Sequence, residues 1–109
     1  MLAPDQRKYP RVKPPSSLVV AWQSGMTRDV SYVESLALGG LFLRTKSPAP
    51  LRSSVQLLMD MPIGQVRGRG IVRRVQRALG MAVEIIAMGP EDRARLKRQL
   101  RDLLPDQNH

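Results

Sequence analysis

The stretch Gln65-Val66-Arg67-Gly68-Arg69-Gly70-Ile71-Val72-Arg73-Arg74-Val75 decides the fold class of this chain. Successive side chains of a strand point to opposite faces, so the pattern can be sorted by alternation. One face carries Val66, Gly68, Gly70 and Val72. The other face carries Arg67, Arg69 and Arg73. The alternation predicts a strand that is apolar inside and basic outside, and the inward glycines indicate a bend or a close backbone approach.

Five further stretches have the composition of short strands, with β-branched and large apolar residues bounded by turn signals. They are Leu18–Gln23, Met26–Ser35, Leu41–Thr45, Val55–Met59 and Leu79–Ile86. Ser24-Gly25 separates the first two, which predicts a hairpin. Six short strands with tight connections predict a mainly β fold, namely a small closed antiparallel barrel.

One helix is predicted at residues 90–104. Pro90 suits its first position, and the acidic pair Glu91 and Asp92 suits the positive end of the helix dipole. An apolar stripe runs along it through Leu96, Leu100, Leu103 and Leu104. We expect this stripe to pack over one opening of the sheet, although a partner surface is the alternative. The domain plan is an N-terminal arm at 1–17, a barrel with its helix at 18–104, and a tail at 105–109.

The composition excludes several kinds of site. The 109 residues fit one domain, and they include no cysteine and one histidine, His109, at the C-terminus. Disulfides, thiolate metal sites and histidine-based catalysis are therefore not expected. The nine acidic residues show no paired-carboxylate or metal-ligand spacing. We predict a protein that is not an enzyme and that holds no metal or cofactor.

The charge points to anionic partners. The chain has 18 Lys and Arg against nine Asp and Glu, a formal net charge of +9, and 14 of its cations are arginine. A strip of five could bind nucleic acid: Arg67, Arg69, Arg73, Arg74 and Arg77. Aromatic residues make up only 4% of the chain, too few for a stacking platform, so a solvated outer face is favoured. With no apolar run of membrane-spanning length and no signal-peptide pattern, we expect a cytoplasmic protein without membrane insertion.

The segment Gln6-Arg7-Lys8-Tyr9-Pro10-Arg11 places two arginines on a stiffened arm. Pro10 removes a backbone donor and biases Tyr9 toward extended geometry, so a helix cannot form there. Each guanidinium offers a planar fork of donors to phosphate oxygens or to the edge of guanine. Arg7 and Arg11 could therefore clamp a compact anionic purine ligand. A solvated basic tail is the alternative.

Together with the predicted barrel, two segments resemble the PilZ domain family. Arg7-Lys8-Tyr9-Pro10-Arg11 matches the family's Arg-x-x-x-Arg motif. Ser35-Leu36-Ala37-Leu38-Gly39-Gly40 matches its Asp/Asn-x-Ser-x-x-Gly motif only in part, because Ser35 replaces the Asp/Asn and Ala37 replaces the serine. Gly40 keeps the glycine position. The resemblance covers roughly residues 7–104.

The resemblance implies a six-stranded barrel with a C-terminal helix and an arm that wraps over cyclic di-GMP. Arg7, Arg11, Ser35 and Gly40 would then contact this ligand. Ser35 offers one hydroxyl oxygen where a carboxylate offers a fork, so affinity is expected to be lower than in members with an intact motif.

The implied function is a cyclic di-GMP receptor or adaptor that signals through an unidentified protein partner. Two alternatives stay open: a ligand-silent interaction module in pilus, motility or envelope control, and, less favoured, a small basic nucleic-acid-binding barrel. We expect a monomer or weak dimer.

Overall fold

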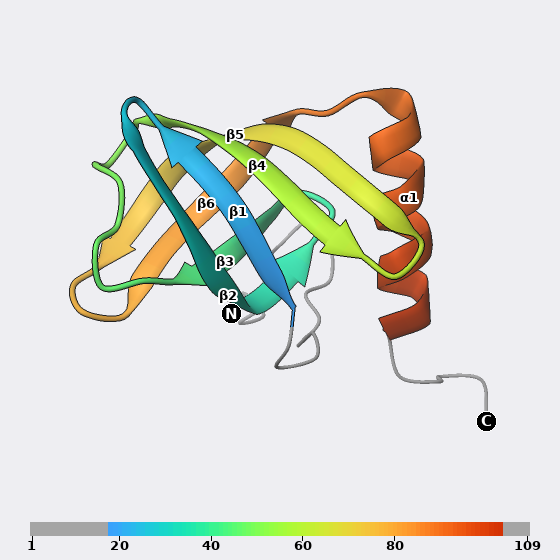
Figure 1. Ribbon diagram of the computed structural model, residues 1–109, viewed down its shortest axis with the longest axis horizontal. Helices are drawn as coiled ribbons and strands as arrows, with labels where there is room; N and C mark the ends of the chain where they lie inside the picture. The colour runs from blue at the N-terminus through green and yellow to red at the C-terminus, as the bar shows by residue number, and fades with distance from the viewer. Residues whose placement is uncertain (1–17, 104–109) are drawn as a thin grey trace, which may run out of the picture.

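The computed structural model describes residues 18–103 as a six-stranded barrel with one helix (Figure 1). The strands are β1 (Val19–Ser24), β2 (Thr27–Ala37), β3 (Gly40–Arg44), β4 (Ser54–Met61), β5 (Gly64–Gln76) and β6 (Gly80–Ala87). The helix α1 spans Pro90–Leu103. All six predicted strands and the predicted helix are therefore confirmed, with small shifts at their ends. The predicted arm and tail lie outside the described residues.

Every strand pairs antiparallel with two neighbours, so the barrel is closed. The order around it is β1-β2-β3-β6-β5-β4, with β4 returning to β1. The predicted β1–β2 hairpin is confirmed by pairing from Val19↔Tyr32 to Ser24↔Thr27. A closed barrel has no free sheet edge. Any partner of this barrel must therefore contact side chains or the barrel ends.

The second strand is longer than predicted. β2 continues past Ser35 through Leu36 to Ala37, and a two-residue turn then leads into β3. Ala37 pairs with Gly40 directly across this turn. Leu36 is fully buried in the core, which explains why the strand continues: ending it at Ser35 would remove an inward leucine. The second motif thus spans the end of β2, the turn and the start of β3.

The core is filled by the inward face of each strand. Its fully buried side chains include Val20, Leu36, Leu41, Leu43, Val55, Met59, Val66, Val72 and Met81. Trp22 points inward with them, and its indole Nε1–H donates a hydrogen bond of 2.9 Å to the buried Ser31 hydroxyl. The alternation predicted for β5 is confirmed, since Val66, Gly70 and Val72 are buried while Arg67, Arg69 and Arg73 are exposed.

Gly70 marks a close approach of two backbones, as its inward position predicted. A Cβ atom there would meet the Val83 side chain and would lie 2.7 Å from the carbonyl oxygen of Glu84. The register between β5 and β6 also shifts between Arg69 and Gly70, and again between Val72 and Arg74. Such bulges bend a strand and increase its twist, which a small barrel needs for closure.

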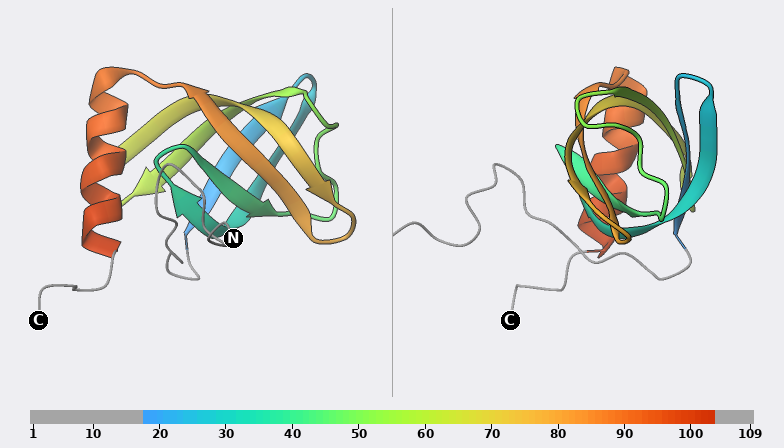
Figure 2. Two further views of the ribbon diagram at one scale, coloured as in Figure 1. Left: turned by 180° about the vertical axis from the view of Figure 1, so that it is seen from behind. Right: turned by 90° about the vertical axis from the view of Figure 1, so that its left-hand side faces the viewer.

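The two barrel ends are covered differently (Figures 1 and 2). Helix α1 lies across one end, and its Leu96 and Leu100 join the hydrophobic core, which confirms the expected packing of the leucine stripe. The β3–β4 connection passes the other end, where Ala49 is buried and its N–H points to the Met81 sulfur at 3.4 Å. Both coverings leave the outer sides of the strands as the accessible surface.

Candidate functional site

A row of outward-facing residues crosses four strands and includes Ser35. Ser35 of β2 pairs with Phe42 of β3, Phe42 pairs with Ala82 of β6, and Ala82 pairs with Arg74 of β5. Phe42 and Ala82 lie on the opposite face of their strands from Leu41, Leu43, Met81 and Val83, which fill the core, although Phe42 is only 6% exposed. The β-strand register therefore brings the second motif beside the arginine-rich end of β5.

This row lies in a surface hollow of about 530 Å³. Its lining is Glu34, Ser35, Phe42, Arg73, Arg74, Gln76 and Ala82. We call it the Ser35 hollow. Two bulges shape it: the register shifts between Val33 and Ser35 in β2, and between Val72 and Arg74 in β5. A bulge turns two consecutive side chains toward one face, so Glu34 and Ser35 line the hollow together, as do Arg73 and Arg74.

The charged groups of the Ser35 hollow differ in their partners. Arg73 Nε donates to Glu84 Oε1 at 2.6 Å, an ion pair in which both side chains are about half exposed. Glu34 lies 3.9 Å from Arg44 Nε, a loose and exposed contact. The Arg74 side chain forms no hydrogen bond or ion pair within residues 18–103. Its guanidinium is therefore the cation in this hollow that can bind an anion without first breaking an ion pair.

The structure describes two of the four predicted site residues, Ser35 and Gly40. Ser35 lines the hollow, whereas Gly40 is not part of its lining. Packing requires a glycine at position 40, because a Cβ atom there would lie 2.6 Å from the Val83 carbonyl oxygen of β6, and the role of Gly40 at a ligand stays a prediction. Arg7 and Arg11 lie outside the described residues, so their part in a site stays a prediction.

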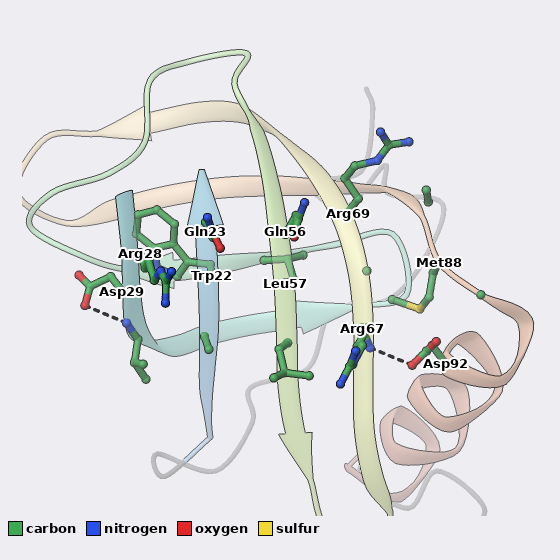
Figure 3. A pocket seen from close by; sticks show the side chains of 16 residues that line it. Trp22, Gln23, Arg28, Asp29, Gln56, Leu57, Arg67, Arg69, Met88 and Asp92 are labelled. Atoms are coloured by element: carbon green, nitrogen blue, oxygen red, sulfur yellow. Dashed lines mark hydrogen bonds between the residues drawn. The ribbon is translucent and has the colours of Figure 1, made fainter. Parts of the chain in front are cut away.

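Sequence reasoning assigned Arg74 to the basic strip and did not place it beside Ser35. The predicted basic strip is divided between two hollows, since Arg67 and Arg69 line a different one (Figure 3). Arg73 and Arg74 line the Ser35 hollow, and Arg77 lines neither. The Arg73-Arg74 pair is the sequence signal that could have indicated this division of the arginines, because two consecutive arginines in an alternating strand indicate a bulge.

Within residues 18–103, no group of three or more His, Asp or Glu side chains could hold a metal ion. No helix in the same range is long and apolar enough to cross a membrane.

The family model of the PilZ domain matches residues 5–102. The chain belongs to the PilZ domain family. The match includes the predicted arm as well as the barrel and most of the helix, so the family assignment rests on nearly the whole chain. The family resemblance inferred from the two motifs is thereby confirmed, and no catalytic family is indicated.

Solved structures share the fold of this PilZ domain. The inhibitor of motility MotI/DgrA of Bacillus subtilis superposes with a TM-score of 0.77 at 18% identity, covering 95% of this chain and 54% of that chain. The PilZ domain of YcgR from Escherichia coli, solved with c-di-GMP, gives 0.69 at 14% identity over 91% of this chain and 92% of that chain. The MrkH–c-di-GMP complex of K. pneumonia gives 0.74 at 15% identity, covering 91% of this chain and 52% of that chain.

The PilZ domain spans about half the length of the MotI and MrkH chains that it matches. The similarity to these two proteins therefore concerns one part of each. A search of curated proteins found no significant match.

Proposed function

We propose that this PilZ domain is a cyclic di-GMP receptor that acts as an adaptor toward a protein partner. In this proposal the ligand occupies the Ser35 hollow, and the arginines of the arm, Arg7 and Arg11, close over it. The observation that carries the proposal is the row from Ser35 to Arg74, because it joins a residue of the family motif to an available guanidinium across a concave surface.

The chemistry of the hollow suits a cyclic dinucleotide. Cyclic di-GMP carries two phosphodiester anions and two guanine bases with hydrogen-bonding edges. A guanidinium can donate two parallel hydrogen bonds to a phosphate or to guanine O6 and N7. Arg74 offers one such fork in the hollow, and the two arm arginines would supply two more. Two solved relatives, the YcgR PilZ domain and MrkH, contain c-di-GMP, which supports the choice of ligand.

The altered motif lowers the expected affinity. A net hydrogen bond is worth ~0.5–1.5 kcal/mol, and a hydrogen bond to a charged group ~1.5–3 kcal/mol. Ser35 in place of Asp/Asn removes about one hydrogen bond to a charged group, and Ala37 in place of Ser removes about one ordinary hydrogen bond. The combined loss of ~2–4.5 kcal/mol corresponds to a roughly 30- to 2000-fold weaker affinity. We therefore propose a weak receptor whose remaining affinity comes from its arginines.

Calorimetric titration of the purified chain with cyclic di-GMP tests the proposal. We expect saturable binding that weakens with salt, because phosphate contacts are screened. Cyclic di-AMP is the matched control, since it keeps the phosphates and lacks the guanine edges. Equal affinity for both ligands would mean that binding comes from attraction between charges and not from recognition of the guanine bases. Absence of heat at millimolar ligand in a folded sample would favour the ligand-silent interaction module.

A further inference from the structure

A second hollow of about 900 Å³ lies on the outer side of β1, β2, β4 and β5 (Figure 3). Its residues do not overlap with those of the Ser35 hollow. The strand register orders its surface into two rows that run across the strands. One row is Val30, Ala21, Leu58 and Arg67, and the other is Arg28, Gln23, Gln56 and Arg69. We call this surface the Gln23–Gln56 face.

The first row gives the face an apolar floor. Val30 is 59% exposed, although it is a large aliphatic residue on a strand. Ala21 and Leu58 beside it are half-buried. A contiguous apolar strip with a polar border is typical of an interaction site rather than of a solvated surface.

The cations of the face are available, whereas its anions are occupied. The guanidinium groups of Arg28, Arg67 and Arg69 make no hydrogen bond or ion pair within residues 18–103. Asp92 Oδ1 accepts a 2.9 Å hydrogen bond from the Arg67 backbone N–H and lies 3.8 Å from Arg95 Nη1. Asp29 Oδ1 accepts a 2.8 Å hydrogen bond from the Val30 backbone N–H. The face therefore presents unpaired positive charge around an apolar floor.

The closed barrel limits which secondary structure a partner can present to this face. A peptide cannot be added to this sheet as an extra strand, because the closed barrel has no free edge. Arg28 on β2 and Arg69 on β5 both line the hollow, with β1 and β4 between them. An α-helix with its side chains is about 10–12 Å wide. A helix laid along β1 and β4 would therefore cover the amides of Gln23 and Gln56, with Arg28 on one side and Arg69 on the other (Figure 3).

We propose that the Gln23–Gln56 face binds an acidic amphipathic helix of a partner protein. The apolar stripe of that helix would cover Ala21 and Leu58, which lie on the strands between the two arginines, and carboxylates on its two flanks would pair with Arg28 and Arg69. This inference gives a surface to the adaptor role proposed above, and it does not require that the domain binds cyclic di-GMP. The two proposed surfaces share β2 and β5 and differ in the strands between them: β3 and β6 for the ligand, β1 and β4 for the partner.

Nucleic acid fits this face less well. The only aromatic side chain that lines the hollow, Trp22, is 2% exposed and cannot stack on a base. The aliphatic floor matches leucine side chains better than sugar or phosphate groups.

A designed peptide tests the inference with the full chain. The probe is a fluorescein-labelled peptide of about 20 residues, long enough to form a helix on binding, with leucines at i, i+3, i+4 and i+7 and glutamates on the flanks. Fluorescence anisotropy gives its affinity, and backbone amide shifts in NMR spectra locate it. We expect saturable binding with the largest shifts at Gln23, Arg28, Gln56 and Arg69. Shifts confined to the Ser35 hollow, or no binding at millimolar protein, would overturn the proposal.

Variants separate the face from general charge attraction. Arg28→Ala with Arg69→Ala should weaken peptide binding at least about tenfold, whereas Arg98→Ala, on an exposed part of α1 outside the hollow, should change it less than about twofold. Gln56→Glu is a second variant that places repulsion at the centre and should also weaken binding. Equal losses in the Arg98 variant, equal binding of a scrambled peptide of the same charge, or tighter binding of a single-stranded oligonucleotide would each contradict the proposal.

The same samples keep the two proposals distinguishable. A titration with cyclic di-GMP should give unchanged affinity in the Arg28/Arg69 double variant, because the two hollows share no residue. Peptide binding without ligand binding would reject the receptor function and keep the helix site. Ligand binding without peptide binding would reject the helix site and keep the receptor function.

Discussion

Ser35 on β2 and Arg74 on β5 lie on one row of the barrel surface, joined through Phe42 and Ala82, although their strands are not neighbours in the sheet. The relationship depends on β3 and β6, which lie between them. It also depends on the β5 bulge that turns Arg74 toward the same face as Arg73. The Ser35 hollow therefore contains a cation that the family motifs do not include.

Arg74→Ala should weaken cyclic di-GMP binding at least about tenfold, because it removes a charge-assisted hydrogen-bond donor from the hollow. The matched control is Arg77→Ala, which removes the same charge from an exposed turn that lines neither hollow. Arg73→Ala should have the smaller effect of the two hollow variants, since Arg73 is already paired with Glu84. Calorimetry at fixed salt measures all three. Equal affinities for the Arg74 and Arg77 variants would exclude the hollow as the ligand site.

The alternation of single strands was predictable from sequence, but their neighbours were not. In β5 the inward Val66 and Val72 and the outward Arg67 and Arg69 follow from period-2 patterning, which is local. The pairing of β3 with β6, and the return of β4 to β1, depend on contacts between residues far apart in the chain. No local pattern encodes such contacts, so the strand order came only from the structure.

The candidate site was likewise predictable from the sequence only in part. Ser35 was found from a motif, and its place in a hollow is a consequence of the bulge between Val33 and Ser35. Gly40 is predicted to allow a close approach to ligand, which stays a prediction, and the structure shows a close approach to the Val83 carbonyl. Both requirements select glycine, so the residue type alone cannot distinguish them.

Arg7→Ala and Arg11→Ala should each weaken cyclic di-GMP binding strongly without lowering the melting temperature. Each removes one guanidinium fork worth a few kcal/mol, and neither residue is needed to form the barrel core described for residues 18–103. Lys13→Ala is the control for general arm charge. Calorimetry and thermal melting together check this prediction. Ligand affinity that survives the loss of both arginines would reject the proposed role of the arm.

Gly70→Ala should lower the free energy of unfolding by ~1–3 kcal/mol, because the added methyl group meets the Val83 side chain and the Glu84 backbone. Gly68→Ala is a matched control two positions earlier on the same face. Its methyl group would first meet the end of the flexible Met88 side chain at 3.0 Å, so its effect should stay below ~1 kcal/mol. Denaturant unfolding of both variants measures the difference, and similar stabilities would contradict the close β5–β6 approach.

Ser31→Ala should destabilise the domain by ~1–3 kcal/mol, because it leaves the buried Trp22 indole N–H without its acceptor. Ser47→Ala, on the exposed β3–β4 connection, is the control and should stay within ~0.5 kcal/mol of the parent. Thermal and urea unfolding check both values. A Ser31 variant as stable as the parent would mean that another acceptor reaches the indole.

Ser35→Asp tests whether the second motif contacts ligand. The substitution restores a carboxylate that can accept from two guanine donors, at a partly exposed position on the row that leads to Arg74. We expect cyclic di-GMP to bind about tenfold more tightly, a gain of ~1.4 kcal/mol. The gain is below the full value of a charged hydrogen bond, because the new carboxylate can also pair with Arg74 in the ligand-free state.

The comparison with Ala37 and Ser47 makes this test specific. Ala37 is 3% exposed, so a hydroxyl at that position must find a partner or it destabilises the fold. Ser35→Asp is therefore measured alone before Ala37→Ser is added. Ser47→Asp adds the same charge on the distant β3–β4 connection, and it should leave affinity unchanged or slightly weaker. If Ser35→Asp binds no more tightly than Ser47→Asp while both proteins stay folded, then Ser35 does not contact the guanine base, and the alignment of the second motif with this turn is wrong.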